Sequence, residues 1–159
     1  MKTKSASFWI SSLALLAVAA AAAQTPQILS VEEPQKVVVP RQDEVRIVLR
    51  ASMRPGYHAN SDTPSESYLI PLRLTWDAQG PLQVVEIRYP KPKLEKFAFT
   101  GKPISVVDGE FEIVTRFRRA PNAMPGPAFL QGKLRYQACN DKMCFPPKTL
   151  DVKVPLLIQ

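Results

Sequence analysis

Proline is the residue type that most restricts how this chain can fold. The sequence has 16 prolines in 159 residues, about twice the usual share. Each proline fixes φ and removes a backbone donor, so prolines break helices and lie at turns, strand ends or sheet edges. They recur here between short runs of β-type residues. We therefore expect strands joined by proline-containing turns, and no long helices.

Alternating apolar and polar residues indicate where these strands lie. The clearest run is 45–53, where every second residue is apolar and Arg46 and Arg50 stand between them. Residues 24–40 are expected as an extended lead-in, and residues 57–66 as a polar, turn-rich connection. The expected strands are 37–39, 45–53, 68–76, 82–89, 104–107, 111–117, 128–138 and 148–154. Such spacing predicts an all-β fold, an antiparallel immunoglobulin-like β-sandwich in a single domain.

The N-terminus has the pattern of a cleaved secretory signal. Lys2 and Lys4 precede an apolar run at 8–20, and three alanines at 21–23 form a small-residue cleavage site. We expect residues 1–23 to be a signal peptide and residues 24–159 to be the mature, periplasmic domain, which is not membrane-spanning. An uncleaved membrane anchor is the alternative, because the apolar run approaches spanning length.

The charge of the chain restricts its partners. The net charge is +7, and removing the signal with its two lysines leaves +5. Basic residues cluster at Lys91, Lys93 and Lys96 and again at 116–119, where solvated strand faces are the simplest interpretation. Nucleic acid is not expected as a partner of an exported chain without a binding motif. Attraction to acidic protein surfaces is the remaining functional interpretation.

The two cysteines of the chain, Cys139 and Cys144, lie in one expected hairpin. Asn140 and Asp141 are turn formers between the strands at 134–138 and 148–154. Residues facing each other across such a pair lie about 4.5–5.5 Å apart at Cα, which is within reach of a disulfide. The prolines at 146 and 147 cannot donate to a ladder, so this end of the hairpin should be open to a partner.

A bridge in this hairpin can be interpreted in more than one way. A ring this small contributes only about 2 kcal/mol to stability in the chain-entropy model. A redox-active pair is therefore favoured over an inert structural bridge in a partner-binding module. A third interpretation is a copper site formed by the two thiolates with His58 and Met143, because soft sulfur ligands suit Cu(I). Nothing in the sequence brings His58, a presumed surface residue, near Cys139, so we predict no metal and no cofactor.

The connection at 90–103 is the second candidate for function. It is long for a compact domain, and such loops are often functional. Phe97 and Phe99 lie within it, and at least one of them must pack against other residues. The loop is interpreted either as a lid over the cysteine pair or as a loop base that fills the core.

These residues resemble a known family. The hairpin with Cys139, Cys144 and the two prolines after Phe145, preceded by the segment Phe99-Thr-Gly-Lys102, is similar to the N-terminal periplasmic domain of the thiol–disulfide interchange protein DsbD. The resemblance covers roughly residues 31–154. It implies an immunoglobulin-like oxidoreductase domain whose cysteine pair passes electrons between thioredoxin-like proteins. In that family, electrons come from a membrane-embedded conduit and go to disulfide isomerases and to cytochrome c maturation.

The same resemblance implies roles for single residues. Cys144 would form the mixed disulfide with partners, Cys139 would resolve it, and Phe99 would be the lid residue. Three differences from the family stand out. Four residues instead of five separate the cysteines, Phe97 and Ala98 replace acidic residues before the lid phenylalanine, and the sequence ends after one domain. We therefore expect either that the membrane electron conduit is a separate polypeptide or that the protein is a stand-alone redox or binding module.

Overall fold

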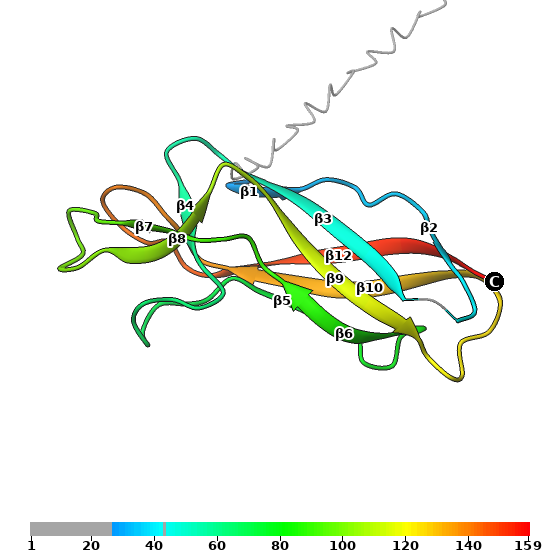
Figure 1. Cartoon of the computed structure of the whole chain (residues 1–159). Helices are drawn as coiled ribbons and strands as arrows, with labels where there is room; N and C mark the ends of the chain where they lie inside the picture. The colour runs from blue at the N-terminus through cyan, green and yellow to red at the C-terminus, as the bar shows by residue number, and fades with distance from the viewer. Residues whose placement is uncertain (1–26, 43) are drawn as a thin grey trace, which may run out of the picture.

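The computed structural model describes residues 27–42 and 44–159, so the expected signal peptide lies outside the described residues. The described residues form strands and no helix, arranged as two larger sheets and one small sheet (Figure 1). The predicted immunoglobulin-like sandwich is confirmed. One strand pair, at the edge of one sheet, is parallel instead of antiparallel.

The first sheet has the strand order β1-β3-β9-β6 and is antiparallel throughout. Its strands are β1 (Leu29–Val31), β3 (Val45–Met53), β6 (Leu82–Arg88) and β9 (Glu110–Arg119). Alternation in β3 places its apolar residues inward and its arginines outward, as predicted. The prediction of an extended lead-in at 24–40 lacked one strand, because β1 lies within it. Leu29 of β1 is fully buried, and β1 pairs with β3.

The second sheet has the order β2-β12-β10-β5. Its strands are β2 (Val37–Val39), β5 (Arg73–Trp76), β10 (Gly126–Tyr136) and β12 (Lys148–Ile158). The strand predicted at 68–76 is wrong in its first half. Pro71 has no amide to donate, and the amide of Leu72 donates to the carbonyl of Ser61 at 3.1 Å instead of joining the sheet.

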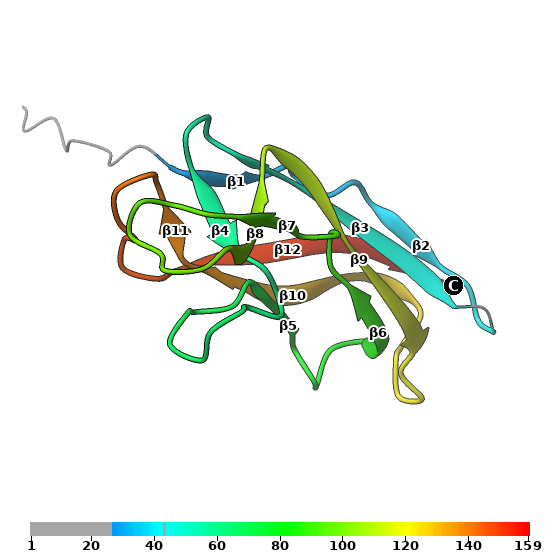
Figure 2. The same cartoon turned by 60° about the vertical axis from the view of Figure 1, so that its left-hand side comes forward.

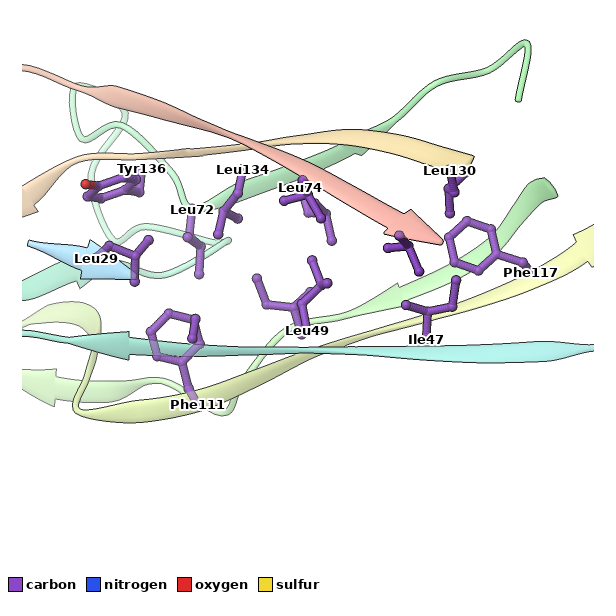
Figure 3. Packing of buried hydrophobic residues seen from close by; sticks show 14 of the residues in the cluster. Leu29, Ile47, Leu49, Leu72, Leu74, Phe111, Phe117, Leu130, Leu134 and Tyr136 are labelled. Carbon is purple, nitrogen blue, oxygen red and sulfur yellow. The ribbon is translucent and has the colours of Figure 1, made fainter. Parts of the chain in front are cut away.

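The main core lies between these two sheets. Side chains from β3 and β9 meet those from β5 and β10, and Leu49, Phe117 and Leu134 are among the fully buried ones (Figure 3). Trp76 donates from Nε1 to the buried hydroxyl of Thr115 at 3.0 Å, which links the two sheets through a polar contact. The long hairpin of β10 and β12 is therefore anchored along its length and ends at the cysteine loop.

The third sheet is small, antiparallel and lies at one end of the sandwich (Figure 2). Its order is β11-β4-β8-β7, with β4 (His58–Asn60), β7 (Lys93–Glu95), β8 (Ile104–Asp108) and β11 (Ala138–Cys139). Two connections predicted without strands, 57–66 and 90–103, therefore contain β4 and β7. Both strands are three residues long, too short for a periodic signal, and β4 forms by pairing with the distant strands β8 and β11.

Candidate functional site

Cys139 and Cys144 form a disulfide at the tip of the β10–β12 hairpin. The two residues also face each other as an isolated antiparallel bridge. Their Cα atoms are 3.9 Å apart, closer than the expected range. The predicted cross-strand placement of the pair is therefore confirmed, with Cys139 in β11 and Cys144 on the returning chain.

The loop between the cysteines is held by hydrogen bonds of its own. Asn140 accepts at Oδ1 from the amides of Lys142 and Met143, both at 2.9 Å. The amide of Phe145 donates to the carbonyl of Ala138 at 2.8 Å. These bonds do not depend on the disulfide, so the loop has the means to keep its shape when the cysteines are reduced.

Gln137 connects this loop to the rest of the site. Its Nε2 donates to the carbonyl of Phe145 at 3.1 Å, and its Oε1 accepts from Asn60 and from the amide of Ile70, each at 3.4 Å. Phe145 also packs against Tyr57, with ring centroids 5.9 Å apart. Sequence reasoning missed Gln137, because two of its partners, Asn60 and Ile70, lie far from it along the chain.

The two sulfur-bearing residues differ in exposure. Cys139 is 0% exposed, whereas Cys144 is partly exposed. Its neighbours Met143, Pro146 and Pro147 are exposed, and Met143 reaches 55%. A reagent or partner can therefore reach Cys144 from the loop side, while Cys139 stays covered.

The small sheet places Cys139 in a row of polar residues. Cys144 faces Cys139, Cys139 faces His58 across β11 and β4, and His58 faces Asp108 across β4 and β8. Residues directly opposite in neighbouring strands project their side chains to the same face. The opposite face, with Ala59, joins the main core. We call the face with Cys139, His58 and Asp108 the outer face of the small sheet.

His58 was predicted to be a surface residue distant from Cys139, and this prediction is wrong. It is only 4% exposed, and pairing on both sides of β4 buries it beside Cys139. Burial lowers the pKa of His58, and the charge of Asp108 opposes this effect in part. Asp108 is itself paired with Lys93 at 2.5 Å. The imidazole is therefore neutral at neutral pH and has a carboxylate beside it.

Phe97 and Phe99 form a two-ring stack over His58. The Phe97 ring lies 4.0 Å from the imidazole, centroid to centroid, at an interplanar angle of 14°. Phe99 stacks on Phe97 at 5.7 Å and is 40% exposed. Phe97 also packs against a second apolar cluster, formed by Leu69, Ile104 and Val106. Phe97 thus combines core packing with covering the outer face, and Phe99 is the outermost ring.

The loop that carries these rings, 96–103, lies at the same end of the molecule as the cysteine loop in both views (Figure 1 and Figure 2). The covered residue at the centre of the stack is His58, the neighbour of Cys139 in the sheet. The sequence held no local signal for the burial of His58, because β4 has only three residues and all three are buried.

The basic clusters seen in the sequence are partly neutralised. Arg116 pairs with Glu44 and Glu86, each at 3.0 Å, and Arg118 also pairs with Glu44. These pairs lie on the first sheet, away from the cysteine loop, and fit the interpretation as a solvated strand face. Across the residues that the structure describes, the chain forms no helix long and apolar enough to cross a membrane.

Comparison with known proteins places the chain in context. A family model described as "Thiol:disulfide interchange protein DsbD, N-terminal" matches residues 25–156. The N-terminal periplasmic domain of ScsB from Proteus mirabilis has a similar structure, with 16% sequence identity and a TM-score of 0.54. The similarity covers 79% of this chain but only 44% of the ScsB chain.

A second similar structure is the DsbD N-terminal domain from Neisseria meningitidis in its reduced form. Its identity is also 16%, its TM-score is 0.46, and the match covers 68% of this chain and 74% of that one. No curated protein matches the chain by sequence. At such low identity the structural likeness concerns the fold, and the family model carries the assignment.

Proposed function

Because the chain belongs to the family of thiol–disulfide interchange protein DsbD N-terminal domains, we propose that it exchanges disulfides with thioredoxin-like proteins in the periplasm. In this role it is a thiol–disulfide oxidoreductase, and its site consists of Cys139 and Cys144 together with the loop whose Phe97 and Phe99 stack over the neighbouring His58. Electrons would reach it from a membrane-embedded conduit. They would leave to periplasmic acceptors such as those of cytochrome c maturation.

The observation that supports this proposal most is the unequal exposure of the two cysteines. Exchange proceeds by attack of a thiolate on a disulfide and needs one accessible and one resolving sulfur. Cys144 is partly exposed in a loop, and Cys139 is buried directly behind it. The function of an inert structural bridge does not require that one cysteine be more exposed than the other.

The exchange can be written with these two sulfurs. In the reduced protein, the Cys144 thiolate attacks the partner's disulfide and forms a mixed disulfide, releasing one partner thiolate. Cys139 then attacks the sulfur of Cys144, which restores the Cys139–Cys144 disulfide and frees the second partner thiol. Two electrons pass to the partner. Reduction by a donor follows the same steps in reverse.

Trapping of a partner tests the roles of the two sulfurs. Cys139→Ala should hold a thioredoxin-like protein as a stable mixed disulfide through Cys144, because the resolving sulfur is gone. Cys144→Ala should trap little. Non-reducing gels and mass spectrometry of the linked peptides measure both. Equal trapping by both variants, or trapping by Cys144→Ala alone, would contradict the assignment.

A further inference from the structure

His58 is a buried polar residue of the site that the exchange chemistry described so far does not use. It faces Cys139 directly in the β4–β11 ladder. Side chains of such opposed residues are about 4.5–5.5 Å apart at Cβ, on one face of the sheet. The imidazole and the buried sulfur are therefore neighbours on the outer face.

The imidazole is buried with a ring nitrogen left over. Its Nε2 has no hydrogen-bond partner among the described residues, although the side chain is only 4% exposed. Buried polar atoms without partners are rare, because each one costs free energy, and they call for an explanation. Phe97 stacks on the ring and keeps it from bulk water. A buried imidazole with an unpaired ring nitrogen thus lies beside Cys139 in the disulfide form.

The charged groups around His58 suit a ring that takes up a proton. Asp108 faces it from β8, and Cys139 faces it from β11. Lys93 on β7 pairs with the Asp108 carboxylate, and Glu95 lies on the same strand as Lys93. Burial lowers the pKa of His58, and the Asp108 carboxylate opposes this effect by favouring an imidazolium ion.

Cys139 needs such an acceptor because of where it lies. A thiol buried in apolar surroundings ionises less readily than an exposed one, and only the thiolate is the nucleophile. Cys139 is fully buried, so water is poorly placed to take its proton. A neighbouring base should therefore accelerate the resolving step, in which Cys139 attacks, more than the first step, in which Cys144 attacks.

We propose that His58 accepts the proton of the Cys139 thiol during the resolving step, and that Asp108 is a positioning residue that orients the imidazole and stabilises its charged form. This inference rests on the proposed function, which assigns Cys139 as the resolving sulfur. The S–H bond of Cys139 breaks as its sulfur bonds to Cys144. The Cys144–partner bond breaks, the departing sulfur takes the electron pair, and His58 returns the proton to it or to water.

A small aromatic disulfide, dithiobis(nitrobenzoate), separates the two steps without a protein partner. Attack by Cys144 releases one coloured thiolate, and resolution by Cys139 releases the second. The Cys139→Ala variant shows the first phase alone and calibrates it. In His58→Phe, which keeps a ring for Phe97 to stack on, the second phase should be slower at pH 7 by about tenfold or more, with the first phase unchanged.

The pH profile separates a proton acceptor from a packing residue. In the wild type the second phase should vary little between the pKa of His58 and that of an ordinary thiol, about 8.5. In His58→Phe it should rise about tenfold per pH unit, because it follows the thiolate fraction. The two proteins should then converge at high pH. Parallel profiles, or an unchanged second phase, would overturn the proposal.

Asp108 offers an independent variant, useful if His58→Phe does not fold. Asp108 is partly exposed, so Asp108→Asn should be tolerated, should slow the second phase, and should lower the pKa of His58. Asp108→Glu should restore both. His58 is the single histidine of the chain, so its NMR titration in untagged protein is unambiguous. An Asp108→Asn variant with wild-type kinetics and an unshifted His58 would overturn the positioning role. Partner trapping by Cys139→Ala is measured separately. The proposed exchange function and the proposed role of His58 can therefore fail independently of each other.

Discussion

Reduction of the Cys139–Cys144 disulfide should cost the folded protein little stability. The cysteines are five positions apart, and the chain-entropy model gives about 2 kcal/mol for a ring of this size. The loop keeps the bond from Phe145 to Ala138 and the turn around Asn140 after reduction. We expect the free energy of unfolding to fall by about 2 kcal/mol or less.

The difference in stability between the oxidised and the reduced protein also determines how far folding shifts the reduction potential of the cysteine pair. A gain of about 2 kcal/mol from the bridge puts the potential of the folded pair about 45 mV below that of the unfolded chain. Urea unfolding of the oxidised and reduced proteins measures the first quantity. Equilibration with glutathione buffers, with and without denaturant, measures the second. The double variant Cys139→Ala, Cys144→Ala should unfold like the reduced protein.

A large difference between the two forms would refute this reasoning. If the oxidised protein were more stable by above about 4 kcal/mol, or the potential lower by above about 90 mV, the bridge would act as a structural staple. A potential well below about −300 mV would support the alternative, a partner-binding module with a passive disulfide.

Three further predictions concern the residues around the cysteines. Phe99→Ala should raise the alkylation rate of the reduced protein with little loss of stability, while Phe97→Ala should also lower the melting temperature; no acceleration in Phe99→Ala would contradict the lid. The lowered pKa of His58 means that the unfolded chain binds its proton more readily, so the free energy of unfolding should fall as the pH drops below about 6.5, levelling off below the folded pKa. His58→Phe should lack this part of the fall in urea titrations, and an identical pH profile would disprove it. The reduced protein should not retain Cu(I) against a chelator, since Met143 lies exposed at the loop tip; one retained equivalent, lost in Met143→Ala, would revive the copper site.

The sandwich could be predicted from the sequence because its strands are long and regular. Alternation over 45–53 and 111–117 is retained in β3 and β9, which pair along most of their length. The cysteine hairpin was also predictable, because both strands and the turn formers are contiguous. In these segments local pattern and tertiary contacts favour the same structure.

The small sheet could not be predicted as a unit, although a strand was expected at 104–107, where β8 lies. β4 and β7 have three residues each, too few for a periodic signal, and they form by pairing with β8 and β11. His58 carries no local sign of burial, because its neighbours come from about 50 and 80 positions along the chain. Cys139, His58 and Asp108 are thus brought into one row by the pairing of strands that are far apart in the sequence.

Because Cys139 is buried, Cys144 is the cysteine at which a partner can react. In a protein that works as proposed, an electron donor and an electron acceptor must both react at Cys144, and they cannot be bound there at the same time. The first partner has to depart before the second arrives, which gives ping-pong kinetics. Throughput then depends on how quickly partners are exchanged, and an excess of one partner inhibits turnover by excluding the other.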